Sequence, residues 1–310
     1  MKTGIVFAGQ GSQYVGMGQD FYEKEPAFRE IFDLLTREER EAAFHGPEET
    51  LRETTITQPV MLAFAMGVYR VLQERSGGFS PAMAAGLSLG EYSALAAAGV
   101  FDAETALTLI RRRSQLMAGC ASQEETEMSA IIGLDRETVE AACAAGREVG
   151  RVEVANYNCP GQMVVSGSAE GVTACEEYLK AQGKGRCVRL SVSGPFHTSY
   201  MEPAERGLRE YFQQVSFQSM AFPVLFNYLG DVCPEGTSVK ELLAMQVSHS
   251  VRFEETIRRM SEAGIERVIE IGPGKVLSGF IRKTDRSIAL MQIDKAEDLD
   301  KVAAVLREEK

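Results

Sequence analysis

The sequence predicts an α/β protein with a parallel sheet, into which a smaller subdomain of β-α-β-β-α-β order is inserted. Apolar runs of strand length alternate with helical segments towards both ends of the chain, and six shorter elements lie between them. A chain of 310 residues can bury a large core, in one domain or in a domain with a smaller one inserted. We therefore expect a large domain from residues 1–125 and 194–310 and a small subdomain from 126–193.

The N-terminal part of the chain alternates strands with helices. A buried strand is expected at 5–8, ending in the glycine-rich loop Gly9-Gln10-Gly11-Ser12-Gln13. Pro59 favours the first turn of a helix, because proline lacks the N–H that this turn leaves unbonded. A second strand is expected at 81–85. The helices expected in this part are 17–35, 58–74, 91–98 and 103–117.

The order of elements in the middle of the chain predicts the small subdomain. Its expected strands are 128–134, 152–156, 163–166 and 187–192, and its expected helices are 137–145 and 169–181. This is the order of a ferredoxin-like fold. The acidic residues at the junction with the large domain, Glu124, Glu125 and Glu127, fit a solvated linker. Beyond it we expect strands at 224–227 and 267–271 and helices beginning near Val239, near Phe253 and after Gly272-Pro273-Gly274.

Composition excludes several classes of protein. The formal charge of −11 argues against a protein that binds nucleic acid or an anionic membrane, because phosphate binding needs a positive field. The six cysteines form no C-x-x-C pair, and with only three histidines no metal site is expected. Free thiols fit a cytoplasmic protein. The first residues are too short an apolar run for a signal peptide, and no run is expected to approach the length of a membrane span.

The most informative motif is Gly86-Leu87-Ser88-Leu89-Gly90, a G-x-S-x-G pattern. It stands where an apolar run becomes a helical pattern, which is the context of a nucleophile elbow: a tight strand-to-helix turn with glycines where a Cβ would clash. The competing interpretation is an ordinary glycine-bounded turn. We interpret Ser88 as a nucleophile exposed at a helix N-terminus.

A serine nucleophile needs a base, and the chain offers three histidines. His45 resembles a polar loop residue, and His249 lies between two helical segments. His197 follows a rigid Gly194-Pro195 turn at the exit of the small subdomain, from which it could face Ser88 between the two lobes. We therefore expect His197 to be the base. No acidic residue completes a Ser-His-Asp set, so a backbone carbonyl is a candidate to orient the imidazole.

The tetrahedral oxyanion of acyl transfer needs N–H donors. One is expected from the backbone of Leu89, directly after the nucleophile, and a second from the glycine-rich loop that contains Gln10. This loop fails as a dinucleotide-binding motif, because Tyr14 stands where the third glycine is needed. Gly272-Pro273-Gly274-Lys275 likewise lacks the upstream glycine of a P-loop.

Arg113 is the second informative residue. On a helix at 103–117 it falls in the middle of the apolar stripe, whereas Arg111 and Arg112 point elsewhere. A buried guanidinium needs an anionic partner. That partner is either a carboxylate of the protein or a carboxylate on an acyl substrate, and the sequence leaves both open.

Together these residues resemble the malonyl-CoA:acyl carrier protein transacylase family of fatty acid synthesis, and more broadly the acyltransferase domains of polyketide synthases. The resemblance covers essentially the whole chain. Its landmarks are Phe7-Ala8-Gly9-Gln10-Gly11-Ser12-Gln13, Thr57-Gln58-Pro59, Gly86-Leu87-Ser88-Leu89-Gly90-Glu91-Tyr92, Asn156-Tyr157-Asn158-Cys159-Pro160-Gly161-Gln162, Gly194-Pro195-Phe196-His197 and Glu270-Ile271-Gly272-Pro273-Gly274-Lys275.

The resemblance implies an α/β-hydrolase-like large domain with a ferredoxin-like insertion, and a ping-pong transfer of malonyl from malonyl-CoA through serine to the phosphopantetheine thiol of acyl carrier protein. It implies no metal and no cofactor, and a monomer is expected. The implied roles are nucleophile for Ser88, general base and acid for His197, oxyanion hole for the N–H groups of Gln10 and Leu89, substrate contacts for Arg113, Leu87 and Gln246, and orientation of the histidine by the Gln246 carbonyl.

Three positions depart from the family pattern. Leu87 replaces the usual histidine before the nucleophile, which affects substrate choice, and Ala8 stands where proline is more common. His249-Ser250 replaces the usual Asn-Pro, which leaves His249 a minor claim as a substrate contact. The alternatives are a polyketide-synthase-associated acyltransferase, a proofreading acyl hydrolase and a non-catalytic module that docks carrier protein. Arg113 favours an enzyme that transfers a dicarboxylic acyl group over a hydrolase that acts on uncharged acyl chains.

Overall fold

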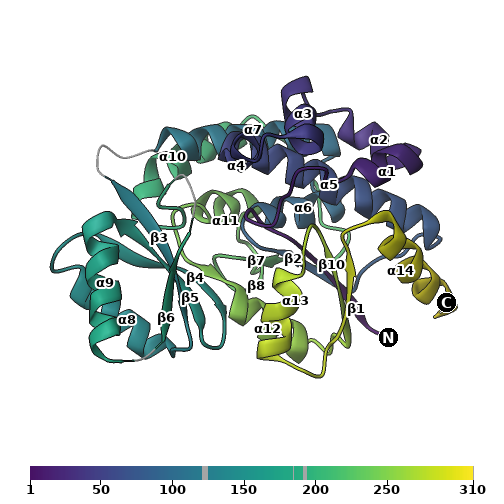
Figure 1. Cartoon of the computed structure of the whole chain (residues 1–310). Coiled ribbons are helices and arrows are strands. Elements are labelled where there is room, and N and C mark those ends of the chain that lie inside the picture. Colours follow the sequence, from purple (N-terminus) through teal and green to yellow (C-terminus); the bar gives the residue numbers. More distant parts are fainter. Residues whose placement is uncertain (121–124, 184, 191–193, 310) are drawn as a thin grey trace. The chain divides into compact units, whose positions relative to one another are not determined.

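The computed structural model describes residues 1–120, 125–183, 185–190 and 194–309 (Figure 1). The chain folds as two compact units. Unit 1 comprises Met1–Ser114, Ser216–Phe226 and the chain from Ile257 onwards, and unit 2 comprises Gln115–Val215 and Asn227–Thr256. The domain boundaries expected from the sequence, 1–125 with 194–310 for the large domain and 126–193 for the subdomain, remain a prediction. Glu124 of the expected linker lies outside the described residues.

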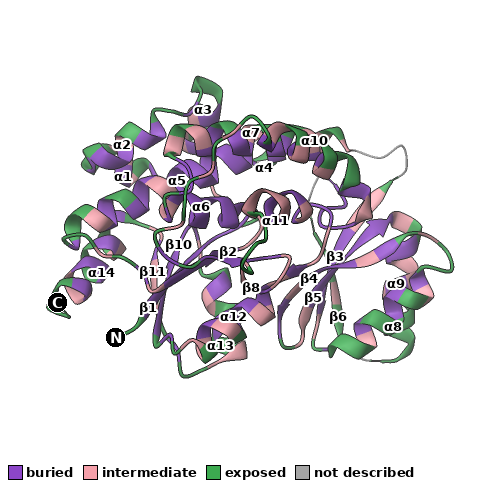
Figure 2. Ribbon diagram, turned by 180° about the vertical axis from the view of Figure 1, so that it is seen from behind, coloured by how far each residue is buried: buried purple, intermediate pink, exposed green. Residues whose placement is uncertain are grey.

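Unit 1 contains a parallel sheet of order β11-β10-β1-β2, formed by Ala289–Ile293, Arg267–Ile271, Thr3–Phe7 and Met83–Gly86. All residues of β1, β2 and β10 are buried, and Figure 2 shows these strands in purple. Such continuous apolar strands are typical of a parallel sheet covered on both faces. The expected strand at 224–227 appears as β7, Leu225–Phe226, and Val224 bridges to Ala84 of β2.

The helices of unit 1 differ from the sequence prediction at two prolines. The helix expected at 17–35 divides into α1 (Gln19–Lys24) and α2 (Pro26–Phe32), because a residue before proline avoids the helical region and Glu25 is extended. Helix α5 (Thr54–Arg75) begins before the expected start, so Pro59 lies inside it rather than in its first turn. The other helices are α3 (Arg37–His45), α4 (Glu48–Arg52), α6 (Leu89–Ala97), α7 (Ala103–Gly119, which continues into unit 2), α13 (Val276–Thr284) and α14 (Ala296–Glu308).

Helix α5 corrects one expectation about membranes. By length and composition it could cross a membrane, so the expectation that no run approaches a span is wrong. However, 83% of its apolar window is buried inside the protein, where it packs against α2 and α6. The helix therefore serves as the core helix of unit 1.

Unit 2 contains a second sheet of order β6-β3-β5-β4-β9, formed by Arg186–Arg189, Thr126–Ile132, Gln162–Ser168, Val152–Cys159 and Val251–Arg252. Helices α8 (Arg136–Gly146) and α9 (Ala169–Ala181) pack on its strands around an apolar cluster that includes Val139, Val165 and Val172. The β-α-β-β-α-β order is as predicted, and β9 adds a parallel strand to it. Residues 191 and 192 of the expected last strand lie outside the described residues.

The rest of unit 2 carries His197 and Gln246, two of the candidate site residues. A short 3-10 helix, Ser199–Met201, runs into α10 (Glu202–Phe212) just after His197. Strand β8 (Asp231–Val232) precedes α11 (Val239–Met245), and Gln246 caps the C-terminus of α11. Helix α12 (Phe253–Glu262) leads back into unit 1.

Candidate active site

Ser88 lies on the turn that joins β2 to α6, and the turn requires both glycines of the motif. A Cβ on Gly86 would lie 2.0 Å from the backbone of Gly90, and a Cβ on Gly90 would lie 2.2 Å from the Phe7 carbonyl oxygen. Ser88 itself has φ 54° and ψ −106°, a conformation that residues with a side chain rarely adopt. The strand-to-helix elbow expected from the sequence is therefore present.

The glycine-rich loop lies beside this elbow because of the strand register. Phe7 at the end of β1 pairs with Gly86 at the end of β2, so both loops leave the same edge of the sheet. The Leu87 N–H donates to the Phe7 carbonyl at 3.1 Å, and a Cβ on Gly9 would lie 2.6 Å from the Leu87 oxygen. Leu89 begins α6, so its N–H has no acceptor within the helix. The loop of Gln10 and the start of α6 are thus neighbours of Ser88.

Arg113 projects from α7 to Ser88 and is 1% exposed. Its Nη2 donates to Ser88 Oγ at 2.9 Å, and its Nη1 donates to Gln58 Oε1 at 2.6 Å. Its guanidinium carbon lies 5.4 Å from the centre of the Tyr92 ring. Arg111, two residues earlier, instead pairs with Glu39 at 2.6 Å. The helical periodicity of the sequence therefore selected the arginine that reaches the serine.

A second row of side chains continues from Arg113 to the glycine-rich loop. Thr54 Oγ1 accepts a hydrogen bond from Gln58 Nε2 at 2.8 Å and donates to Gln10 Oε1 at 3.0 Å. Gln58 and Thr54 are buried and lie one turn apart on α5. This network links the side chain of the expected oxyanion residue to the arginine.

Burial controls the electrostatics around Arg113. Desolvation lowers the pKa of its guanidinium, while the nearby Tyr92 and Glu91 act to raise it. Burial also raises the pKa of the Tyr92 hydroxyl, so the phenol stays neutral. Because an arginine keeps its charge in proteins, the serine hydroxyl faces a desolvated cation. The buried Glu91 carboxylate acts on this cation, which keeps open the alternative of a protein carboxylate as its partner.

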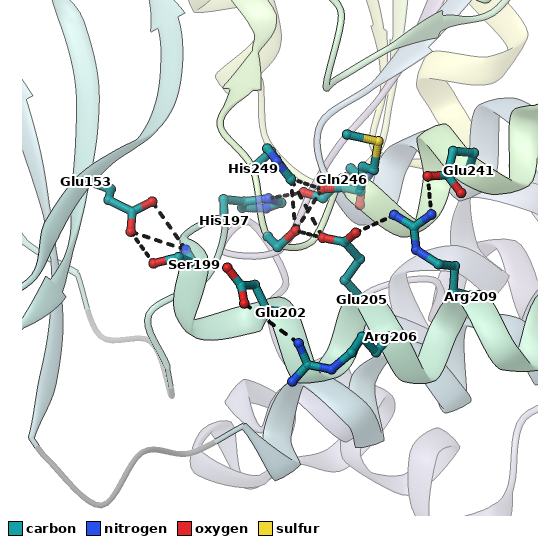
Figure 3. A network of polar contacts seen from close by, with 12 residues as sticks. Glu153, His197, Ser199, Glu202, Glu205, Arg206, Arg209, Glu241, Gln246 and His249 are labelled. Atoms are coloured by element: carbon teal, nitrogen blue, oxygen red, sulfur yellow. Dashed lines mark hydrogen bonds and ion pairs between the residues drawn. The ribbon is translucent and has the colours of Figure 1, made fainter. Parts of the chain in front are cut away.

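His197 lies in unit 2, in a turn before α10, and is 4% exposed. Its Nδ1 lies 2.9 Å from the carbonyl oxygen of Gln246 (Figure 3), and its backbone N–H donates to the Val247 carbonyl at 3.1 Å. A carbonyl only accepts hydrogen bonds, so Nδ1 carries the proton and Nε2 presents a lone pair. The imidazole thus has the tautomer that a general base needs. The Gln246 carbonyl occupies the orienting place that the resemblance implies.

The other two histidines occupy different surroundings. His249 Nδ1 lies 2.9 Å from the Met245 carbonyl oxygen and 2.9 Å from Ser248 Oγ, and its ring packs edge-on against Tyr228. His45 is exposed and is the last residue of α3, not a loop residue. Among the described residues no group of three or more His, Cys, Asp or Glu could hold a metal ion.

Sequence reasoning assigned no role to several of these residues. Thr57-Gln58-Pro59 was a landmark of the resemblance, but the hydrogen bond from Arg113 to Gln58 joins residues 55 positions apart. The spacing of Thr54 and Gln58, four residues apart on a helix, was the available signal for their contact. No comparable pattern in the sequence indicated which side chains lie around Gln246.

The elbow serine, the buried arginine that donates to it and the parallel sheet fit one class of protein, the α/β acyltransferases. The chain belongs to the acyl transferase domain family, whose model matches residues 5–307. This confirms the family resemblance and the α/β fold expected from the sequence.

Individual relatives match over nearly their whole length. The malonyl CoA-acyl carrier protein transacylase of Bacillus subtilis is 38% identical over 313 residues, which cover 99% of this chain and 98% of that protein. The structure of MCAT from Streptococcus pneumoniae is 42% identical with a TM-score of 0.90, covering 99% of this chain and 100% of that one. A malonyl-transacylase in complex with a type II PKS acyl-carrier protein is 34% identical with a TM-score of 0.94, covering 98% of this chain and 100% of that one.

Proposed function

We propose that this protein is an ACP S-malonyltransferase, which moves a malonyl group from malonyl-CoA to the phosphopantetheine thiol of acyl carrier protein and so supplies fatty acid synthesis. Similarity over the full chain to malonyl CoA-acyl carrier protein transacylases supports the substrate and the partner. The 2.9 Å hydrogen bond from a buried arginine to the elbow serine carries the assignment to a dicarboxylic acyl group.

The first half-reaction forms a malonyl-serine. Ser88 Oγ attacks the thioester carbonyl while its proton passes to Nε2 of His197, and the N–H groups of Gln10 and Leu89 hold the oxyanion. Collapse of the tetrahedral intermediate breaks the bond to sulfur, and the coenzyme A thiol leaves with the proton from His197. The second half-reaction reverses these steps with the thiol of the carrier protein, which regenerates the Ser88 hydroxyl.

Arg113 supplies recognition rather than proton transfer. It is a planar donor fork in a desolvated site, and it reaches the atom that bears the acyl group. A malonyl carboxylate on Ser88 would offer this fork an anion of matching geometry. Leu87, in place of the family histidine, leaves recognition of the carboxylate more dependent on Arg113.

We also propose that the protein acts in the cytoplasm and that it is a monomer.

Intact-protein mass measured after mixing with malonyl-CoA tests this function. We expect a malonyl adduct that maps to Ser88 and disappears when phosphopantetheinylated carrier protein is added, with malonyl gained by the carrier. An adduct lost to water at the same rate without carrier would indicate a hydrolase. Absence of any adduct would indicate a non-catalytic docking module and overturn the proposal.

A further inference from the structure

Two segments far apart in the sequence meet at His197. One is the turn that contains His197 and continues into α10, and the other is the end of α11 with residues 246–249. They are joined at the histidine by the bond from its ring to the Gln246 carbonyl and by the bond from its backbone N–H to Val247. Gln246 and Val247 are fully buried. The position of the imidazole therefore depends on how the 246–249 segment is held.

Glu205 on α10 holds that segment. Its carboxylate accepts the hydroxyl hydrogen of Ser248, two residues after Gln246. The same carboxylate lies 3.9 Å from His249 Nδ1 and is bonded by Arg209 at 2.5 Å, and Arg209 also pairs with Glu241 on α11. Only 13% of the Glu205 side chain is exposed. The partly buried Glu205 carboxylate thus accepts several hydrogen bonds and links α10 to the 246–249 segment, which contains the orienting carbonyl.

The electrostatics agree with an ionised Glu205. Burial raises the pKa of this carboxyl, but hydrogen bonds from Ser248 and Arg209 and the charge of Arg209 lower it, and the result is below its usual range. The carboxylate is therefore an acceptor at neutral pH. A charged acceptor makes a stronger hydrogen bond than a neutral one.

We propose that Glu205 is a positioning residue for the general base: through Ser248 it keeps the Gln246 carbonyl on Nδ1 of His197. The proposal rests on the role of His197 proposed above. It gives the site an acidic residue that the sequence did not reveal, acting through a hydroxyl and a backbone carbonyl instead of touching the imidazole as in a Ser-His-Asp triad. Both Glu205 and Ser248 are needed for this link.

Loss of the link between Glu205 and Ser248 should change the tautomer of the His197 imidazole more than it changes the stability of the fold. If the 246–249 segment shifts, the Gln246 carbonyl no longer fixes the proton on Nδ1, and the tautomer with the proton on Nε2 becomes populated. That tautomer cannot accept the proton of Ser88. The expected effects are a smaller acylation rate constant, an altered pH profile and an unchanged KM for malonyl-CoA.

The test compares Glu205→Ala, Glu205→Gln and Ser248→Ala with the control Glu202→Gln. Glu202 lies one turn earlier on α10, is exposed and pairs with Arg206, so its variant removes the same charge from the same helix. The chain has only three histidines, so long-range proton–nitrogen NMR assigns the tautomer of each ring. Single-turnover acylation across pH and a melting curve complete the set.

We expect Glu205→Ala and Ser248→Ala each to slow acylation on the order of 10-fold, within the contribution that acid-base catalysis makes. The His197 Nδ1–H signal should weaken in both. Glu205→Gln should recover part of the rate, because its amide oxygen still accepts from Ser248. The double variant Glu205→Ala/Ser248→Ala should be no slower than either single variant, since both changes break one link.

The proposal is overturned if all three variants match Glu202→Gln in His197 tautomer and in pH profile, whatever their melting temperatures. If Glu205→Ala does not fold, Ser248→Ala decides by the same readouts, because it breaks the link and leaves the carboxylate in place. Failure of the underlying function gives a different result. In that case His197→Ala itself would acylate at the wild-type rate.

Discussion

The Ser88 region in unit 1 and the His197 region in unit 2 hold strained residues in opposite ways. Among the described residues, the non-glycine residues with positive φ are Ser88, at 54°, and His197, at 61°. At Ser88 the conformation is fixed by close backbone contacts at Gly86 and Gly90, where a Cβ has no room. At His197 it is held by hydrogen bonds to Gln246 and Val247. Steric contacts thus position Ser88, the proposed nucleophile, and polar contacts position His197, the proposed base.

Because of this difference, the Ser88 region and the His197 region should respond differently to pH, salt and substitution. Steric constraints do not depend on pH or salt, so the elbow should keep its geometry whenever the sheet is folded. A hydrogen-bonded turn depends on every partner being present and correctly protonated. Substitutions of Ser88 or Arg113, which leave Gly86 and Gly90 in place, should therefore change chemistry without changing geometry, whereas substitutions around His197 should change both.

The largest effect is expected at the nucleophile. Ser88→Ala removes one oxygen from a turn that its glycines still define, so the fold should persist while acyl-enzyme formation is abolished. Intact mass after incubation with malonyl-CoA measures the loss, and a melting curve close to that of the wild type is the control. A residual adduct of malonyl mass on the variant would mean that another residue takes the acyl group.

The next effect separates recognition of the substrate from the chemical step in the Ser88 region. Arg113→Ala should cost the malonyl reaction about 2 to 5 kcal/mol in transition-state binding, because the carboxylate would be left unpaired in a desolvated pocket. Acetyl-CoA has no carboxylate to lose, so its kcat/KM should fall far less or rise. The measurement is kcat/KM for both thioesters in wild type and variant.

Arg111→Ala is a matched control on the same helix, because Arg111 pairs with Glu39 and should not affect substrate preference. Equal losses for malonyl-CoA and acetyl-CoA in Arg113→Ala would make Arg113 a structural partner of Glu91 or Tyr92. The assignment to malonyl would then rest on similarity to other proteins alone.

Loss of the proposed base should have an effect of similar size to that of Arg113→Ala, and it should affect both half-reactions. His197→Ala removes the acceptor of the serine proton and the donor to the leaving thiol, so each step should slow by roughly 10² or more. Rapid-quench measurement of acylation by malonyl-CoA and of deacylation by carrier protein gives the two rates. A variant that acylates near the wild-type rate would transfer the role of base to His249.

More of the Ser88 region than of the His197 region could be predicted from the sequence, for a physical reason. The elbow is encoded within five residues, because its steric demands concern neighbours in the chain. Arg113 could be selected by helical periodicity, another local rule. The contacts that hold the base join Gln246 to a histidine 49 residues away and Ser248 to a glutamate 43 residues away.

Long-range polar contacts of this kind leave no periodic signature. His197 could therefore be proposed as the base from local sequence, with a backbone carbonyl as a candidate to orient it, whereas the place of Gln246 came from the family resemblance. Nothing pointed to Glu205 or to Ser248. Propensity was also overridden locally: Pro59 lies inside a long buried helix, where packing on all sides compensates for the missing N–H.

The smallest effect concerns recognition of the carrier protein, away from both strained residues. A protein of net charge −11 needs local cations to attract an acidic carrier, and Lys275, Arg282 and Lys283 are exposed at α13 or its start. Arg189 is a further cation, but it pairs with Glu127 and Glu176, which makes it a weaker candidate. Replacing Lys275 and Arg282 together by glutamate should raise KM for carrier protein roughly several-fold at low salt.

Malonyl-CoA kinetics should stay unchanged in this variant, because the substitutions touch neither Ser88 nor Arg113. Replacing Lys24 and Lys301 by glutamate changes the net charge equally at other exposed positions and is the matched control. If α13 docks the carrier, only the first pair raises its KM, and the effect fades as salt shortens the range of the interaction. Equal effects of both pairs would show that overall charge repels the carrier. Equal effects on both substrates would show that α13 supports the elbow instead of docking the carrier.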